Sequence, residues 1–274
     1  MKQRHGEELV YRDLVLSQFR REARLGLQIA FYRTYAIPSI ARLLLDTGEL
    51  ISRPVKRGYD TGIIMYELIY HGFEHPRGRE IVSRLNRMHL IYEITNDEYR
   101  YVLGTLIFIP SRLIDRFGAR KLTTAQRAAT FHFYRRLGEH MNIDALPDTW
   151  EAYEAWFDRY ERDHFAFDPA AKALIEASRK MATQRLPRPL RPVASAALDV
   201  LLDEPMRRAL GLPTPAKAMT WLVTRALRLR ARLARDRPPQ AADLWWPGKA
   251  NPAYPAGYTL DLIGPQTQAH IERR

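Results

Sequence analysis

Cysteine is absent from the 274 residues of this sequence. Its absence excludes disulfide bonds, thiolate nucleophiles, iron–sulfur clusters and Cys-rich zinc sites, so a bound metal must use His, carboxylate, Lys, Tyr or Met. Long apolar runs are also missing, because the longest uncharged stretch, residues 101–111, is far shorter than the roughly 20 residues that span a bilayer. With acidic residues at Glu7, Glu8 and Asp13, the N-terminus does not resemble a signal peptide. These features predict a soluble cytoplasmic protein.

Acidic residues are in deficit, with 31 against 43 basic ones and a net charge of +12. Such an excess attracts polyanions, for example nucleic acid or an anionic membrane. The basic residues are dispersed except in one Arg-rich cluster, residues 225–235. No helix-turn-helix, zinc-finger or RNA-binding signature accompanies it, which makes nucleic acid an unlikely partner. A solvated surface is the favoured interpretation of the cluster, and a peripheral membrane-contacting helix is the alternative.

A period of two is nowhere sustained, whereas apolar residues recur at helical spacing almost throughout. This pattern predicts a mainly α fold with one large helical domain. Pro110 is expected to end one of the helices, because proline lacks the backbone donor that continues a helix. The expected helices cover residues 7–35, 39–46, 57–71, 77–94, 98–108, 124–140, 150–164, 170–184, 194–210 and 215–235.

Three prolines within residues 186–192 predict a non-helical hinge or linker. We therefore expect a helical domain over residues 1–185. The appendage over residues 186–274 would contain the Pro-rich hinge, two helices and an extended tail that packs on the same domain.

Among the eight histidines, His89 stands out because it falls on the apolar face of its expected helix, flanked by Leu85 and Tyr92. A buried imidazole needs partners for both nitrogens, and a metal on one with a hydrogen bond on the other supplies them. A core histidine bonded to a neighbouring helix explains the pattern too, and spacing alone favours that interpretation.

Other metal-site patterns are weaker. Glu161 and His164 form an E-x-x-H pattern, but the second copy that di-iron bundles use is missing. This pair is interpreted as the polar face of a surface helix. Glu67 and His71 lie one helical turn apart, which suits a shared metal or a surface pair equally well. No G-x-S-x-G, H-E-x-x-H, P-loop or dinucleotide-binding pattern occurs.

Six short segments between residues 40 and 180 form a recognisable series: Asp46-Thr-Gly-Glu49, Arg57-Gly-Tyr-Asp-Thr61, Pro76-Arg-Gly-Arg79, Asn86-Arg-Met-His89, Asn96-Asp-Glu-Tyr99 and Glu161-Arg-Asp-His-Phe165. The series resembles the catalytic domain of the latex clearing protein (rubber oxygenase) and MpaB family, and is most similar to the MpaB branch. The resemblance depends on the order and spacing of the segments. The resemblance implies a helical haem-protein fold and assigns a haem-binding, oxygenase-like domain to residues 1–185.

The resemblance also implies roles for individual residues. His89 takes the position of the proximal iron ligand of haem b. Arg57 and Thr61 match a pair that lies near the haem, although Asp60 or Thr61 as a simple helix cap deserves comparable weight. Rubber oxygenase has a lysine just before this threonine, and here Asp60 replaces it. We therefore expect the sixth coordination position to be open or to hold water, with Asp60 available as an acid and Tyr92 beside the cofactor.

The catalytic glutamate of the family has two candidate positions, Glu49 and Glu67. The expected reaction is the oxidative cleavage of a double bond in an apolar, prenyl or polyprenyl-like substrate by dioxygen. Four aromatic residues at helical spacing are candidates to line the substrate tunnel, or are plain core: Tyr66, Phe73, Tyr92 and Tyr101. The alternative function is a non-catalytic helical interaction protein whose Arg-rich C-terminal surface binds nucleic acid or an anionic membrane.

Overall fold

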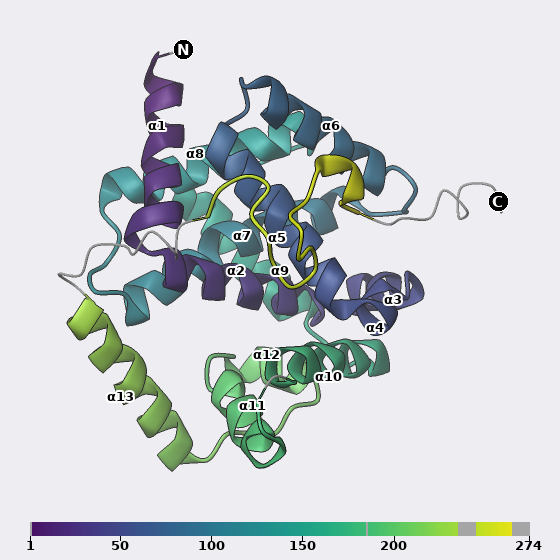
Figure 1. Ribbon diagram of the computed structural model, residues 1–274, viewed down its shortest axis with the longest axis vertical. Coiled ribbons are helices and arrows are strands. Elements are labelled where there is room, and N and C mark those ends of the chain that lie inside the picture. The colour runs from purple at the N-terminus through teal and green to yellow at the C-terminus, as the bar shows by residue number, and fades with distance from the viewer. Residues whose placement is uncertain (1, 185, 235–244, 265–274) are drawn as a thin grey trace.

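The computed structural model describes residues 2–184, 186–234 and 245–264, and most of these residues form helices joined by short connections (Figure 1). This confirms the mainly α fold predicted from the sequence. The α-helices of the described residues are α1 (Lys2–Asp13), α2 (Arg20–Thr34), α3 (Pro38–Asp46), α4 (Glu49–Ser52), α5 (Pro54–His71), α6 (Pro76–His89), α7 (Asn96–Phe117), α8 (Thr124–His140), α9 (Trp150–His164), α10 (Pro169–Thr183), α11 (Arg191–Asp199), α12 (Glu204–Ala209) and α13 (Lys217–Ala234).

The single helix predicted over residues 7–35 is divided in two by a π-helical segment, Leu14–Gln18. Leu14, Val15 and Phe19 are buried at this break. The break separates two packing partners, because α1 contacts α8 whereas α2 contacts α7. The buried break therefore allows one stretch of chain to serve two helix interfaces.

The crossing of α2 and α7 lies at the centre of the core. Gly26 of α2 faces Pro110 of α7 so closely that a Cβ at Gly26 would lie 2.4 Å from the Cα of Pro110. The prediction that Pro110 ends its helix was wrong, since α7 continues to Phe117. Because α7 is buried on both sides of Pro110, tertiary packing outweighs the lost backbone hydrogen bond.

Helix α6 ends at His89, five residues before the predicted end at Ile94. The cause lies in the start of the next helix, where the Thr95 hydroxyl accepts from the Glu98 amide at 3.2 Å and the Glu98 carboxylate accepts from the Thr95 amide at 2.8 Å. This capping box fixes an extended conformation at Thr95. His89 consequently stands at a helix end beside a short connection.

The helix boundaries predicted within residues 186–210 also differ from those in the structure. Arg188–Leu190 is a 3-10 turn, and Pro192 occupies the first turn of α11, where a missing amide costs nothing. The single helix expected over 194–210 is two, α11 and α12, because Asp203 caps α12 by accepting from the Met206 amide at 3.0 Å.

The C-terminal residues 245–264, here called the strap, lie across α5 and α6 (Figure 1). Trp245 packs against Tyr66 of α5, with ring centroids 5.6 Å apart. At the other end of the strap, the Arg84 guanidinium of α6 donates to the carbonyl of Ile263 at 3.1 Å. The strap therefore covers the outer side of the two helices that carry the candidate site residues.

Candidate functional site around His89

His89 is the last residue of α6 and is half-buried. Its Nδ1 lies 2.8 Å from the carbonyl oxygen of Leu85, one turn earlier in the helix. A carbonyl only accepts, so Nδ1 carries the proton and Nε2 keeps its lone pair. Within the part of the chain that the structure describes, no hydrogen-bond partner occupies Nε2. This arrangement, with one nitrogen fixed by a backbone carbonyl, is the one that metal-binding histidines use.

The surroundings of His89 favour the neutral imidazole. Burial lowers the pKa of His89 below its ordinary value, the hydrogen bond to Leu85 opposes this, and the positive charge of Arg57 lowers it again. A histidine binds a metal only when neutral. The ring is therefore in its ligand form at neutral pH.

Helix α5 contributes Arg57 and Thr61, which lie one turn apart on the same face of the helix. The Arg57 guanidinium donates to the hydroxyl of Thr61 and lies over the Phe31 ring at 5.5 Å. Apart from the adjacent backbone of α5, no atom lies within 4 Å of the place that a Cβ would take at Gly62, which is partly exposed. No other side chain therefore covers α5 at Gly62, directly after Thr61.

Arg57 links several of the residues that sequence reasoning singled out. Burial lowers the pKa of its guanidinium, and four nearby groups oppose that shift by their negative charge in the ionised form: Tyr35, Asp60, Tyr92 and Glu49. Its own charge acts on His89. The structure thus brings Arg57, Thr61, His89 and Tyr92 into one neighbourhood.

Asp60 is turned toward the strap. It is 4% exposed, and its carboxylate accepts from the Tyr254 hydroxyl at 2.5 Å, from Lys56 Nζ at 2.6 Å and from the Gly264 amide at 3.1 Å. Burial and the adjacent Asp60 raise the pKa of Tyr254, which keeps its hydroxyl protonated as a donor. With these three donors, the Asp60 carboxylate binds the strap to α5.

Glu67 is the second anchor of the strap and is completely buried. Its carboxylate accepts from the Tyr258 hydroxyl at 2.7 Å and from Arg77 Nε at 3.3 Å, and His71 Nε2 lies 3.5 Å away. The predicted pair of Glu67 and His71 is therefore real but lies beneath the strap rather than at the surface. Of the two candidate glutamates, only Glu49 is among the groups that act on Arg57.

The surface position predicted for the E-x-x-H pattern at residues 161–164 was wrong for Glu161 and right for His164. Glu161 is buried and accepts from Arg33 Nη2 at 2.6 Å and from the Tyr101 hydroxyl at 3.2 Å. His164 is exposed and stacks on Tyr160, with ring centroids 4.0 Å apart. Glu161 therefore joins α9 to α2 as a buried ion pair. Across the described ranges, no group of three or more His, Cys, Asp or Glu side chains is placed to share a metal ion.

The aromatic residues proposed for a tunnel are dispersed. Phe73 packs in the core against Phe133 at 5.1 Å between ring centroids, and Tyr101 stacks on Phe157 at 5.3 Å. Tyr66 contacts Trp245 of the strap. Of the four, only Tyr92 is among the groups whose charge affects the pKa of Arg57.

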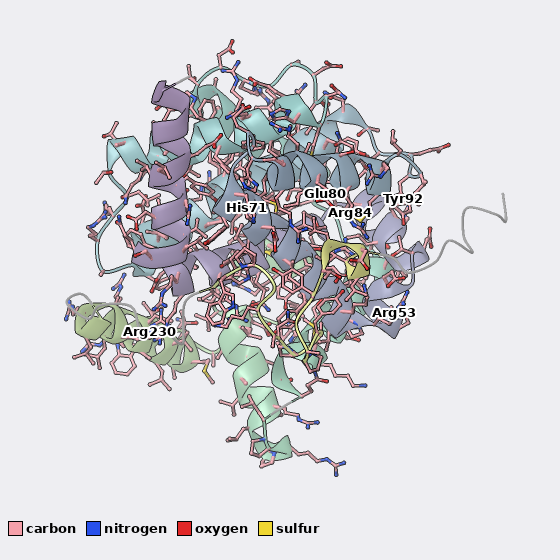
Figure 2. All side chains as sticks on the ribbon, turned by 45° about the horizontal axis from the view of Figure 1, so that its top comes forward. Arg53, His71, Glu80, Arg84, Tyr92 and Arg230 are labelled. Atoms are coloured by element: carbon pink, nitrogen blue, oxygen red, sulfur yellow. The ribbon has the colours of Figure 1, made fainter. Side chains whose placement is uncertain are left out.

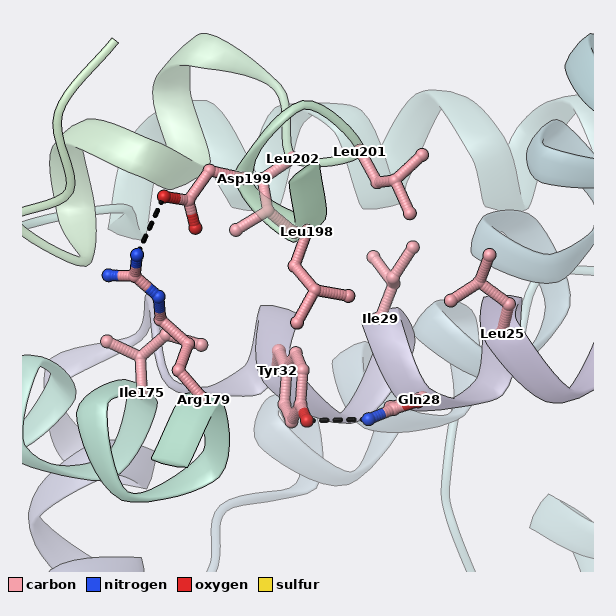
Figure 3. Close-up of a pocket in the computed structure, with 10 residues that line it drawn as sticks. All are labelled: Leu25, Gln28, Ile29, Tyr32, Ile175, Arg179, Leu198, Asp199, Leu201 and Leu202. Atoms are coloured by element: carbon pink, nitrogen blue, oxygen red, sulfur yellow. Dashed lines mark hydrogen bonds and ion pairs between the residues drawn. The ribbon is translucent and has the colours of Figure 1, made fainter. Parts of the chain in front are cut away.

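A small apolar pocket lies elsewhere, between α2, α10 and the end of α11 (Figure 3). The Arg179–Asp199 ion pair, at 3.0 Å, borders it. Its lining contains none of the predicted site residues: Leu25, Gln28, Ile29, Tyr32, Ile175, Arg179, Leu198, Asp199, Leu201 and Leu202.

Sequence reasoning missed the strap tyrosines, Tyr254 and Tyr258, and the partner of Glu161, Arg33. The strap has no periodicity that would have indicated its position. No local sequence pattern distinguishes an arginine that is buried in an ion pair, such as Arg33, from one that is exposed to solvent.

The fold is that of a known class of helical oxygenase. It matches the solved structure of latex clearing protein in the closed state with a TM-score of 0.52 and 18% identity, over 87% of this chain and 67% of that one. The family model described as "ER-bound oxygenase mpaB/B'/Rubber oxygenase, catalytic domain" matches residues 21–235. The chain belongs to this family.

Curated relatives agree with this assignment. The ER-bound oxygenase mpaB' of Penicillium brevicompactum is 26% identical in an alignment of 237 residues that covers 79% of this chain and 56% of that protein. The ER-bound oxygenase mpaB of Penicillium roqueforti is 27% identical over 202 residues, 67% of each chain. The chain thus aligns with little more than half the length of the first relative.

Proposed function

We propose that this protein is a haem b-dependent oxygenase with His89 Nε2 as the protein ligand to iron. The observation that carries the proposal is the fixed, neutral imidazole of His89, with its Nδ1 bonded to Leu85 and its Nε2 available. The uncovered backbone at Gly62 and the guanidinium of Arg57 are compatible with an anionic cofactor beside α5. When bound, haem supplies the chemistry of dioxygen activation, and the protein supplies the ligand and the surroundings.

Arg57 supplies positive charge in this site. Its guanidinium is half-buried, and Thr61 and the Phe31 ring hold it in place. With haem bound, Arg57 would supply charge-assisted hydrogen bonds to a propionate and positive charge near the dioxygen substrate. We assign Tyr92 to the border of the cofactor. Asp60 acts as a positioning residue, because its bonds to the strap fix the turn of α5 that carries Arg57.

We infer an apolar substrate of the prenyl or polyprenyl class, cleaved at a double bond with dioxygen as oxidant. Family membership supports the reaction class. Two large apolar side chains directly after His89 also support it, since Leu90 is 79% and Ile91 51% exposed. Exposed apolar side chains next to a candidate site suit an approaching apolar molecule.

The test is haem retention by the full chain. We expect the wild type to bind haem stoichiometrically with a Soret band, and His89→Ala to lose it while keeping the helical circular-dichroism signal. His164→Ala is the matched control, because His164 also ends a helix with Nδ1 bonded to the carbonyl four residues earlier, at 2.9 Å. Full haem occupancy in His89→Ala, or equal loss in both variants, would contradict the assignment. A colourless wild type would favour the interaction protein instead.

We also propose that the protein contacts a membrane peripherally. A prenyl substrate is itself apolar, and the net charge of +12 attracts anionic lipid. The curated relatives carry "ER-bound" in their names. Among the described helices, none is both long and apolar enough to cross a bilayer.

A further inference from the structure

Helix α13 has an inner face that packs on the protein and an outer face that is exposed among the residues that the structure describes. On the inner face, Ala231 is buried, Leu227 packs against the core, and Arg230 Nη2 bonds to Glu22 of α2 at 2.7 Å. Figure 1 shows α13 along one side of the molecule. Within the described part of the chain, the helix is therefore attached through its inner face and presents its outer face to the surroundings.

The outer face combines large apolar side chains with arginines. At 100° per residue, its apolar members fall within an arc of about 120°. Arginines 225, 228 and 232 are exposed in or beside the same arc, and the 18-residue helix contains no Asp or Glu. The apolar members are Trp221, Leu222, Leu229 and Leu233, which are 63%, 56%, 57% and 60% exposed.

We propose that this outer face of α13 is the membrane contact and that its partner is an anionic lipid bilayer. An interfacial helix has this composition: leucine and tryptophan enter the boundary between headgroups and acyl chains, while arginines bind lipid phosphates. The inference specifies the membrane contact of the proposed function and rests on it, but not on haem binding.

Charge complementarity selects the anionic bilayer over other partners. An Arg-rich helix that contains no Asp or Glu matches a surface that is negative throughout. Nucleic acid would satisfy the arginines but would leave four large apolar side chains against phosphate and water. A bilayer satisfies both kinds of side chain at once, because its apolar and anionic layers lie a few ångströms apart.

Docking through α13 leaves the candidate oxygenase site uncovered. Arg230 of α13 and Tyr92 lie on opposite sides of the molecule in Figure 2. Substitutions on the outer face of α13 should therefore leave haem binding unchanged, which separates the two proposals experimentally.

The experiment is flotation of the full chain with phosphatidylcholine vesicles, with and without phosphatidylserine. We expect binding that requires phosphatidylserine and weakens with salt. The combined variant Arg225→Gln, Arg228→Gln and Arg232→Gln should bind about a hundredfold more weakly, the loss expected from three cations at an anionic surface. Its control is Arg162→Gln, an exposed arginine on α9.

A second variant tests the apolar contribution. Trp221→Ser with Leu229→Ser should also release the protein from vesicles, whereas Leu9→Ser, at an exposed leucine of α1, should not. Trp221 fluorescence, obtained as the difference between the wild type and Trp221→Phe, should shift to the blue when vesicles are added. Circular dichroism confirms that each variant is folded.

Three outcomes would overturn the inference. If the wild type binds to none of the vesicles, the protein makes no membrane contact, and the oxygenase proposal is still tested independently by haem retention. Vesicle binding by both α13 variants at wild-type strength means that another surface makes the contact. Binding of the wild type to DNA that vesicles do not displace, with loss in the arginine variant, assigns the helix to nucleic acid.

Discussion

Gly26→Ala is a substitution for which helix propensity and tertiary packing predict opposite effects. Alanine is favoured over glycine by about 1 kcal/mol in a helix interior. In this protein, however, a Cβ at Gly26 would lie 2.4 Å from the Cα and 2.9 Å from the Cβ of Pro110. Backbone atoms cannot rotate away as a side chain does, so α2 and α7 must separate. Overpacking costs about 1–3 kcal/mol, and taking the upper end leaves a net loss of about 2 kcal/mol.

Urea denaturation followed by circular dichroism measures this difference in the free energy of unfolding. The corresponding fall in Tm is about 4–8 °C. The control is Gly6→Ala in α1, where nothing lies within 4 Å of the new Cβ, and it should gain up to about 1 kcal/mol. A Gly26→Ala protein as stable as the wild type would refute the close crossing of the two helices.

Tyr258→Phe removes a hydroxyl donor from the fully buried Glu67 and should cost about 1.5–3 kcal/mol in urea denaturation; an unchanged midpoint would show that the strap does not bind there. Arg33→Ala leaves the Glu161 carboxylate buried without its cation and should cost about 3–5 kcal/mol, whereas a double variant that removes both charges should recover part of the loss in a double-mutant cycle. Burial lowers the pKa of His71 despite the nearby Glu67, so the unfolded chain takes up the proton more readily. The stabilisation that depends on neutral His71 should therefore be fully present above about pH 6.5, and the free energy of unfolding should fall as the pH drops below that value. His71→Gln should reduce this fall. Equal slopes of the free energy of unfolding against pH in both proteins would contradict the reasoning.

Local signals determined much of the secondary structure. Thr123 and Gln126 form a capping box, and Asp168 caps α10 by accepting from the Ala170 amide at 2.8 Å. The partners of such caps lie within three residues, so the sequence contains the complete interaction. The helical period of apolar residues likewise predicted the mainly α fold, because it repeats within each helix.

The candidate site was partly predictable for the same reason. Arg57 and Thr61 lie four residues apart, which places them on one helix face whatever the tertiary structure. His89 was prominent because its neighbours at helical spacing are apolar. The family resemblance supplied their joint role, which stays a proposal until haem binding is measured.

Only the tertiary structure decided the orientation of the carboxylates. Asp60 and Glu67 look alike in sequence to acids that face a cofactor or solvent, yet Tyr254 and Tyr258, almost 200 residues further along the chain, bind them. The pairing of Arg33 with Glu161 and the passage of α7 through Pro110 depend equally on distant partners. A buried polar group is stable only when another group satisfies it, and which group does so is set by how the helices pack rather than by any pattern within one of them.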